Sequence, residues 1–497
     1  MIARRPALWL LALCTALRLV SLFRPCLSDD EATYAVVGRE MLSGHALYRD
    51  VVDHKPPAIY LVNEVTQAIG GPTGGMFLLH ALLIAVVWAT GLLLGAIVKR
   101  FDAGDRRAPV MAALLWIVFT TTLIDTDSLA ANCELFMMLP LVASVYAFLA
   151  ERWLVAGVLV GVAMLFKYQA GIQLPLFGLA LVVQHRKQLA TVAFGGIAIA
   201  IGVVLPIAAV VGWLYARGAA DAAWFWFRFN FAYINTGSSS AAVQQMAMRV
   251  GLVVAAAAPL YLASAVALRA REPRPFRRFA IGWLVASALA IIVGGRFFGH
   301  YFHQLTAPLA VLAAPTALAW FDRRRVLFVT SLAVPAAVFF VLAAAHDPLM
   351  RAAGEPDPDY PSVVAWLDAH GTPSDAICIW GNSPVLYFDA ARPLGCRFVF
   401  ANYITGLSPA TPSQTDPAVD SSKNAVPVAW DMLESDLATR QPTFLIDASP
   451  GNVGYYGKYP PEHYPRLARI LACHYASEAE VAGLRIYRRL ATPRCSG

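Results

Sequence analysis

Long apolar segments constrain the fold of this chain more than any other feature of its sequence. Runs of roughly 17–25 apolar residues, separated by short polar loops, match the length of an α-helix that crosses about 30 Å of hydrocarbon. Charged residues make up 14% of the chain and hydrophobic residues 58%, whereas soluble domains carry about 25% charged residues. Backbone groups in lipid must be paired within their own segment, so these runs predict helices rather than a barrel. We therefore expect an integral membrane protein.

The apolar runs predict about eleven spans, which would form an all-α bundle over residues 1–345. The expected bounds of the spans are 7–23, 76–98, 108–124, 133–150, 153–168, 171–184, 190–215, 248–268, 279–294, 303–321 and 326–345. The first run follows a basic start, but no small-x-small cleavage site comes after it. It is therefore interpreted as a retained helix rather than a signal peptide.

Arg and Lys gather in every second loop, from Arg4-Arg5 to Arg323-Arg324-Arg325. Cytoplasmic loops of membrane proteins carry an excess of these residues, so the N-terminus is expected inside and everything after Phe340 outside. The formal net charge of +7 is located in these loops, and we expect no nucleic-acid partner. The loops that carry acids and histidines then all lie on the outer face, together with a large first outer loop at 24–75.

From about His346 the composition changes, and alternating strand-like and helical runs predict a soluble outer-face α/β domain over 346–497. The strand-like runs are Ala376–Gly381, Cys396–Phe400, Thr443–Ser449 and Leu484–Arg489, and the helical patterns are Pro361–His370, Val428–Thr439 and Pro465–Ala472. None of the seven cysteines has CxxC or zinc-type spacing, so we expect no thiolate-bound metal. The sequence leaves open whether a disulfide forms in this domain, and Cys396 and Cys473 are the candidate pair.

Three consecutive acids, Asp29, Asp30 and Glu31, follow directly after the first apolar run. A carboxylate at a membrane surface can take a proton from an attacking hydroxyl, or it can hold a divalent metal ion. Helix capping is the competing explanation, since Ser28 or Asp29 could cap a helix over Glu31–Leu42. Capping accounts for one or two acids but not three, so Asp30 and Asp29 are the candidate catalytic residues and Glu31 is a candidate substrate-binding residue.

The same loop continues to His54-Lys55-Pro56-Pro57, where tandem prolines would end one segment and begin a helix over Ala58–Ile69. Lys55 could neutralise a phosphate there, aided by the partial positive charge of the helix N-terminus. An ordinary turn with an interfacial lysine is the alternative.

Two other outer segments carry candidate binding residues. The sequence GGRFFGHYFHQ places Arg296, His300, Tyr301 and His303 between two expected spans. The arginine could grip a lipid phosphate and a histidine could bind a metal or a sugar, although an aromatic belt with a snorkelling arginine is equally compatible with the pattern.

Lys167 lies near the outer end of a short hairpin, which makes it a candidate phosphate contact. Asn132 and Glu134 flank Cys133 at the start of a span, where a buried acid is either a site residue or a helix cap. Asp125-Thr126-Asp127 spells DxD but is interpreted as a helix boundary.

The segments DDEATYAVVGREMLSGHALYRD and HKPPAIY resemble the first outer loop of bacterial protein-mannosyltransferase and aminoarabinose-transferase-like enzymes of the GT-C superfamily. NCELFMMLP, LFKYQAG and GRFFGHYFHQLTAPLAVL are similar to later motifs of this group. The likeness covers residues 7–345. It implies an inverting glycosyltransferase of the bacterial inner membrane that moves a sugar from a polyprenyl-phosphate carrier to an acceptor on the outer face.

By position, the resemblance makes Asp30 the catalytic aspartate and assigns the donor phosphate to Lys55 and Arg296. The family often has an acid immediately before Lys-Pro, where this chain has His54, so the use of a divalent metal is left open. The acceptor is a glycolipid, lipopolysaccharide, a lipid or a protein. A polytopic transporter or flippase of lipid-linked sugars is the alternative function, and an oligosaccharide ligase or polymerase would differ only in its acceptor.

Overall fold

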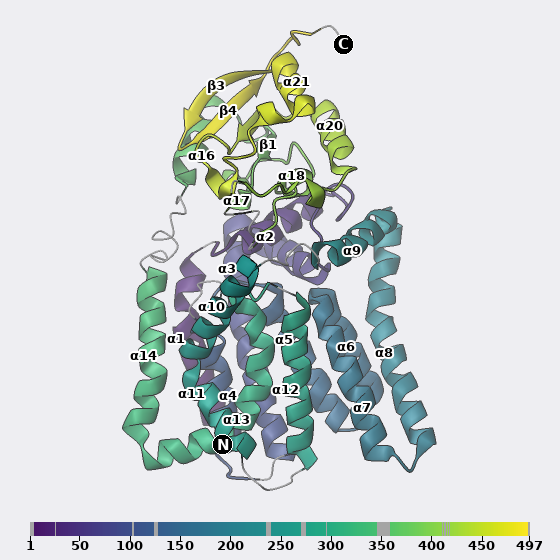
Figure 1. The fold of residues 1–497 in the computed structure, drawn as a ribbon, viewed down its shortest axis with the longest axis vertical. Helices are drawn as coiled ribbons and strands as arrows, with labels where there is room; N and C mark the ends of the chain where they lie inside the picture. Colours follow the sequence, from purple (N-terminus) through teal and green to yellow (C-terminus); the bar gives the residue numbers. More distant parts are fainter. Residues whose placement is uncertain are drawn as a thin grey trace.

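The computed structural model describes most of the chain in two parts, a helical bundle and a C-terminal unit with a small sheet that covers one end of the bundle (Figure 1). The described residues are 4–24, 26–101, 104–123, 128–234, 240–269, 275–294, 296–344, 358–409, 411, 414, 416 and 418–495. The boundary expected at 345/346 lies outside these residues, as does the DxD sequence. The predicted combination of an α-helical bundle and an α/β unit is confirmed.

Ten of the expected spans each fall on one helix of the bundle, and the span expected at 248–268 falls instead on two helices that meet at an angle of 84°. The helices are α1 (Arg4–Phe23), α3 (Ala58–Phe101), α4 (Ala108–Phe119), α5 (Cys133–Leu149), α6 (Trp153–Phe166), α7 (Gln173–His185), α8 (Leu189–Ala216), α10 (Ser240–Ala256), α11 (Ala258–Arg269), α12 (Pro275–Gly294), α13 (His303–Arg323) and α14 (Arg325–Ala344). Among the described residues, five helices are long and apolar enough to cross a membrane, or six when the bent pair α10–α11 is counted as one span. The number eleven remains a prediction.

Two helices that begin in the first outer loop position its candidate residues. Helix α2 (Asp29–Leu42) begins two residues before the expected start, because the Ser28 side chain accepts a hydrogen bond from the Glu31 backbone N–H at its N-terminus. Helix α3 starts at Ala58, as the tandem prolines predicted, and bends at Gly71, whose φ of 68° lies in the left-handed region that glycine tolerates. After this bend α3 continues into the span expected at 76–98.

Glycines allow α6 and α8 to pack closely. A Cβ atom on Gly157 would lie 2.2 Å from the carbonyl oxygen of Ile199, and one on Gly202 would lie 2.3 Å from that of Leu154. Membrane helices associate through close backbone contact, because lipid provides little hydrophobic drive between them.

We expect Gly157→Leu to destabilise the protein by about 1–3 kcal/mol, since the added side chain has no room between the two backbones. Melting of the purified protein in detergent measures this. The matched control is Gly196→Leu on α8, where a Cβ would meet nothing within 4 Å, and equal melting temperatures for the two variants would contradict the prediction.

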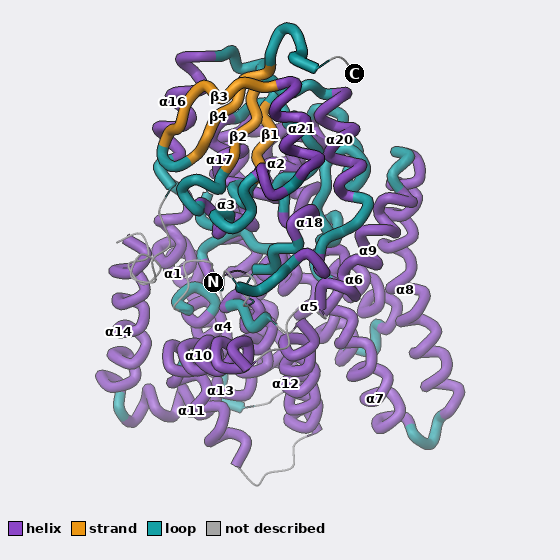
Figure 2. The backbone as a smooth tube through the Cα atoms, turned by 45° about the horizontal axis from the view of Figure 1, so that its top comes forward, coloured by secondary structure: helices purple, strands orange, loops and turns teal. Residues whose placement is uncertain are grey.

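The sheet of the C-terminal unit has four strands in the order β1-β2-β4-β3. Strands β1 (Ile377–Trp380) and β2 (Phe444–Asp447) are parallel, and β4 (Leu484–Arg489) joins β2 and β3 (Tyr475–Val481) in antiparallel register. Around the sheet lie α16 (Tyr360–His370), α17 (Pro384–Ala390), α20 (Ala429–Thr439) and α21 (Pro465–His474), so the three predicted helices are confirmed (Figure 2).

One predicted strand was wrong, and one strand of the sheet was not predicted. The run Cys396–Phe400 is not a strand of this sheet; instead Phe398 forms an isolated parallel bridge with Val52 of the first outer loop. Strand β3 was missed because its sequence, YASEAEV, is polar and mostly exposed, and its pairing with β4 carries an irregularity between Ser477 and Ala479.

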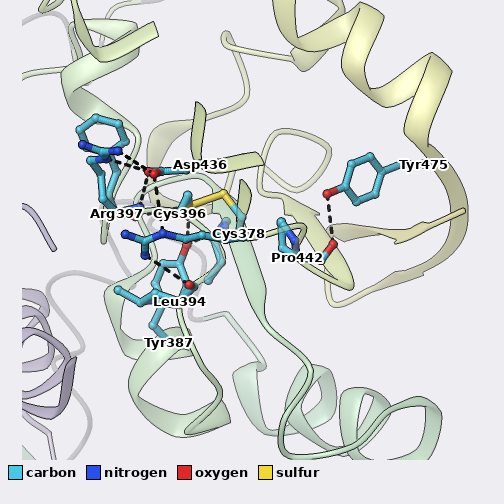
Figure 3. The surroundings of a disulfide bond; sticks show 11 residues. Cys378, Tyr387, Leu394, Cys396, Arg397, Asp436, Pro442 and Tyr475 are labelled. Carbon is cyan, nitrogen blue, oxygen red and sulfur yellow. Dashed lines mark hydrogen bonds and ion pairs between the residues drawn. A yellow bond between two sulfur atoms is a disulfide. The ribbon is translucent and has the colours of Figure 1, made fainter. Parts of the chain in front are cut away.

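The C-terminal unit contains two disulfides, Cys378–Cys396 and Cys473–Cys495. The candidate pair Cys396–Cys473 was therefore wrong, because Cys396 lies beside β1 and not beside α21. Figure 3 shows the first disulfide next to Tyr387 and to Asp436, which pairs with Arg397.

We expect a variant with alanine at both Cys378 and Cys396 to lose about 3 kcal/mol of stability in the C-terminal unit, because the closed loop spans 18 residues. Faster proteolysis of residues 358–495 in the full-length protein would reveal it. Replacing the free Cys26 with alanine is the control, and unchanged proteolysis of the double variant would contradict the expectation.

The C-terminal unit docks directly on the first outer loop. Arg39 of α2 donates to the carbonyl oxygens of Tyr387 and Phe388, and the backbone N–H of Val52 donates to Arg397 O at 2.9 Å. The two parts of the chain therefore meet at the last turn of α2 and just before the turn that carries Lys55.

Candidate active site

Asp30 and Lys55, which both belong to the first outer loop, form an ion pair. Asp30 lies in the first turn of α2, and Lys55 lies directly before the prolines that start α3. The Lys55 Nζ donates to Asp30 Oδ1 at 2.8 Å and lies 4.8 Å from the centre of the Tyr34 ring. The Asp30 side chain is 39% exposed and that of Lys55 is 20% exposed, so both groups can meet a substrate.

Asp53 adds a second carboxylate behind the lysine. It is fully buried, and its Oδ2 lies 3.9 Å from Lys55 Nζ. Burial by itself would lower the pKa of Lys55, but the charges of Asp30 and Asp53 outweigh it and raise this pKa well above its usual value. Burial would likewise raise the pKa of Asp53, yet Lys55 and hydrogen bonds from His54 hold it below its usual value. The two carboxylates thus favour the protonated form of Lys55.

A second charged cluster lies at the outer ends of α5, α6 and α13. The Glu134 carboxylate pairs with Lys167, and His300 Nε2 lies 3.4 Å from Glu134 Oε1. The Lys167 Nζ also lies 3.6 Å from the centre of the Tyr301 ring, in a cation–π contact. Four residues that were separate candidates in the sequence therefore form one cluster.

Tyr34 and Cys133 connect the two charged clusters. The Tyr34 hydroxyl donates to Asp30 Oδ2 at 3.3 Å and contacts Cys133 Sγ at 3.9 Å. Cys133 in turn donates to Glu134 Oε2 at 3.1 Å. Polar contacts thus run continuously from Lys55 through Asp30 to Glu134, and two lysines stand at the two ends of this path.

The other acids of the DDE run have different surroundings. Asp29 is at the exposed end of α2. Glu31 is fully buried, where it accepts hydrogen bonds from the backbone N–H groups of Leu27 and Ala131 and lies 2.9 Å from His80 Nε2. Its carboxylate fastens α2 to the loop before α5, which is a structural role.

Arg296 and His54 face the C-terminal unit. Arg296 is 5% exposed and donates to Pro409 O and Ser408 Oγ. His54 Nδ1 lies 2.9 Å from the Tyr403 hydroxyl and 3.1 Å from Asp53 Oδ1. His54 therefore contacts Asp53, whereas His300 contacts Glu134, so the two histidines have different carboxylate partners.

Among the described residues, no group of three or more His, Cys, Asp and Glu side chains could hold a metal ion. Asp30 contacts a lysine and a tyrosine, and the second carboxylate, Asp53, lies on the same lysine. This set of groups fits an anion and a hydroxyl better than a divalent cation, which prefers several oxygen ligands.

The fold is similar to that of known membrane glycosyltransferases. ArnT, an aminoarabinose transferase from Cupriavidus metallidurans, in a structure bound to undecaprenyl phosphate, has a TM-score of 0.63 and 16% identity over 97% of this chain and 98% of its own. Its apo structure has a TM-score of 0.61 and 17% identity, with 99% of each chain covered. The oligosaccharyltransferase AglB from Archaeoglobus fulgidus, in complex with an inhibitory peptide and a dolichol-phosphate, has a TM-score of 0.51 and 14% identity over 98% of this chain and 74% of its own.

No family model and no curated protein sequence matches this chain. The solved structures match over nearly its whole length, and both kinds belong to the GT-C superfamily. The chain therefore has the GT-C fold, and the resemblance seen in the first outer loop is confirmed at the level of the fold.

Sequence reasoning passed over three residues of the site, Tyr34, Asp53 and Cys133. Tyr34 lies four residues after Asp30, a spacing that puts both on one helix face and could have revealed it. Asp53 lies two residues before Lys55, and this closeness could have suggested it as a candidate. Nothing in the local sequence indicated that Cys133 would contact Tyr34.

Proposed function

We propose that this protein is an inverting glycosyltransferase that moves a sugar from a polyprenyl-phosphate carrier to an acceptor in the cell envelope. The observation that carries the proposal is the ion pair of Asp30 and Lys55 at 2.8 Å, whose side chains are 39% and 20% exposed, at the end of a GT-C bundle where the C-terminal unit docks. Lipid phosphates bound to ArnT and AglB, which share this fold, support a lipid-linked donor. The sugar and the acceptor, whether glycolipid, lipopolysaccharide, lipid or protein, are not specified by these residues.

In the proposed reaction an acceptor hydroxyl attacks the anomeric carbon of the donor sugar. The bond between that carbon and the phosphate oxygen breaks, and the bonding electrons leave with the polyprenyl phosphate. Asp30 accepts the proton of the hydroxyl as the new glycosidic bond forms. The attack from the side opposite the phosphate inverts the configuration.

Lys55 would stabilise the charge that develops on the leaving phosphate, since it remains protonated and faces the same space as Asp30. Lys167 and His300 lie along the polar path and are proposed as further contacts of the donor, and Tyr301 is proposed to line the donor site beside them. Arg296, which donates hydrogen bonds to Ser408 and Pro409, is proposed as a further contact of the donor phosphate. No step of this mechanism requires a metal ion.

The proposed location is the bacterial inner membrane, with a cytoplasmic N-terminus and a periplasmic C-terminal unit. The basic turns between α7 and α8 and between α13 and α14 lie at the end of the bundle away from the C-terminal unit (Figure 1). This supports the orientation that the positive-inside rule predicts. Two disulfides in the C-terminal unit support an oxidising compartment.

Reconstitution tests the proposal. The purified protein is incubated with undecaprenyl-phosphate sugars and an envelope glycolipid fraction, and release of undecaprenyl phosphate is measured together with the mass of the acceptor. We expect sugar transfer with inversion at the anomeric carbon. Movement of the lipid-linked sugar across vesicles without any change in acceptor mass would favour the flippase instead. Comparing the envelope glycans of cells with and without the protein identifies the acceptor.

A further inference from the structure

Tyr403 brings the C-terminal unit into contact with the proposed active site. It belongs to the short helix α18 (Asn402–Thr405) and is 3% exposed. Its hydroxyl donates to Asp53 Oδ1 at 3.2 Å and lies 2.9 Å from His54 Nδ1. Both partners belong to the turn that delivers Lys55, so a residue far along the chain contacts the centre of the first outer loop.

The Tyr403 ring is held independently of its hydroxyl. It packs against Trp226, with the ring centres 4.6 Å apart, and against Phe229 and Phe400 at 5.4 Å and 5.1 Å. These contacts between large aromatic rings stabilise its position whether or not the hydroxyl is present. Replacing the tyrosine with phenylalanine therefore removes one polar group and keeps the packing.

Asp53 transmits the contact to Lys55. One oxygen of its carboxylate accepts from the Tyr403 hydroxyl and the His54 backbone N–H, and the other accepts from the Tyr60 hydroxyl at 2.7 Å. Hydrogen bonds to a carboxylate fix its orientation and disperse its charge. With its charge satisfied in this way, Asp53 stays 3.9 Å from Lys55 Nζ, while Asp30 holds the same ammonium at 2.8 Å.

We propose that Tyr403 is a positioning residue, which fixes Asp53 and His54 so that Lys55 faces Asp30 and the donor phosphate. The inference rests on the proposed function, and it makes the C-terminal unit a part of the donor site rather than an appendage. Without the hydroxyl, Asp53 would compete more strongly with the phosphate for Lys55.

The test compares Tyr403→Phe with the wild-type full-length protein in detergent. We expect the Kd for undecaprenyl phosphate and the KM for the donor each to rise about tenfold, because a hydrogen bond to a charged group is lost. The kcat should change less than about threefold, since Asp30 is untouched. A merely structural role would lower stability without this split between KM and kcat.

Tyr387→Phe is the matched control. Tyr387 is also a buried tyrosine of the C-terminal unit, and its hydroxyl accepts from the Ile379 backbone N–H instead of contacting the first outer loop (Figure 3). We expect this variant to melt at a lower temperature and to bind undecaprenyl phosphate as the wild type does. Equal lipid affinity of Tyr403→Phe and the wild type would overturn the inference.

A second measurement covers the case in which the variant fails to fold. With 3-fluorotyrosine at position 403 of the otherwise unchanged protein, the ¹⁹F resonance is expected to shift when undecaprenyl phosphate binds, and no shift at saturation would overturn the role of Tyr403. Sugar transfer by the wild type is scored separately. If the wild type transfers no sugar, the proposed function is overturned. The measurements of undecaprenyl phosphate binding would still decide the role of Tyr403.

Discussion

Asp30→Asn is expected to lower the rate of sugar transfer by about 10²–10⁴-fold, because the amide cannot accept the proton of the attacking hydroxyl. The substitution keeps the size of the side chain and its place in the first turn of α2. Binding of undecaprenyl phosphate should persist, since Lys55 is still present and is released from its ion pair. The measurement is single-turnover transfer, with lipid binding determined on the same preparation.

Asp29→Asn separates the two candidate bases. Asp29 is the neighbouring residue on the same helix, and its side chain is exposed. Transfer by this variant should stay within about threefold of the wild type, given the small effects typical of surface substitutions. A large loss with Asp29→Asn and none with Asp30→Asn would reverse the assignment, and graded losses with both would favour a transporter.

Lys55→Met should weaken the binding of undecaprenyl phosphate by at least about 100-fold and lower kcat/KM further, because it removes the cation that faces the leaving phosphate. It should also lower the melting temperature, since Asp53 is fully buried and would lose its countercharge. Wild-type affinity should not decline between about pH 7 and pH 9, as the pKa of Lys55 is raised above its usual value and the ammonium stays protonated.

A double variant distinguishes binding from stability. Adding Asp53→Asn to Lys55→Met removes the unpaired carboxylate, so we expect the melting temperature to recover while lipid affinity stays low. If the affinity for undecaprenyl phosphate recovered together with the melting temperature, Lys55 would stabilise the fold and would not bind the lipid phosphate. Lys55→Arg should retain part of the affinity, because it keeps the charge but changes the geometry of the donors.

Local patterns determined much of this outcome. The apolar runs specify helices because lipid forces each backbone group to pair within its own segment. Every expected span is helical, although the one at 248–268 is divided between α10 and α11. The prolines after Lys55 and the cap at Ser28 likewise specify where α3 and α2 begin. Asp30 and Lys55 could be chosen as candidates because both lie at these helix starts.

Local patterns did not predict which distant segments of the chain pair with one another. Cys378 bonds with Cys396 and not with a partner near α21, and Phe398 pairs with Val52 rather than with the sheet. The disulfide depends on how the C-terminal unit folds, and the bridge to Val52 depends on where that unit docks. Docking is a sum of many weak contacts between segments far apart in the chain, and no single segment carries a signal for it.

The amino-acid sequence by itself determined the helical bundle and the types of side chain available in the loops between its helices, because these depend on hydropathy and on local backbone preferences. Only the tertiary structure decided which of the candidates meet. It put Lys167 and His300 on Glu134, turned Glu31 inward, and placed Tyr403 against the turn before Lys55. Such contacts are set by how helices pack and loops close in three dimensions, which the order of residues along any one segment does not encode.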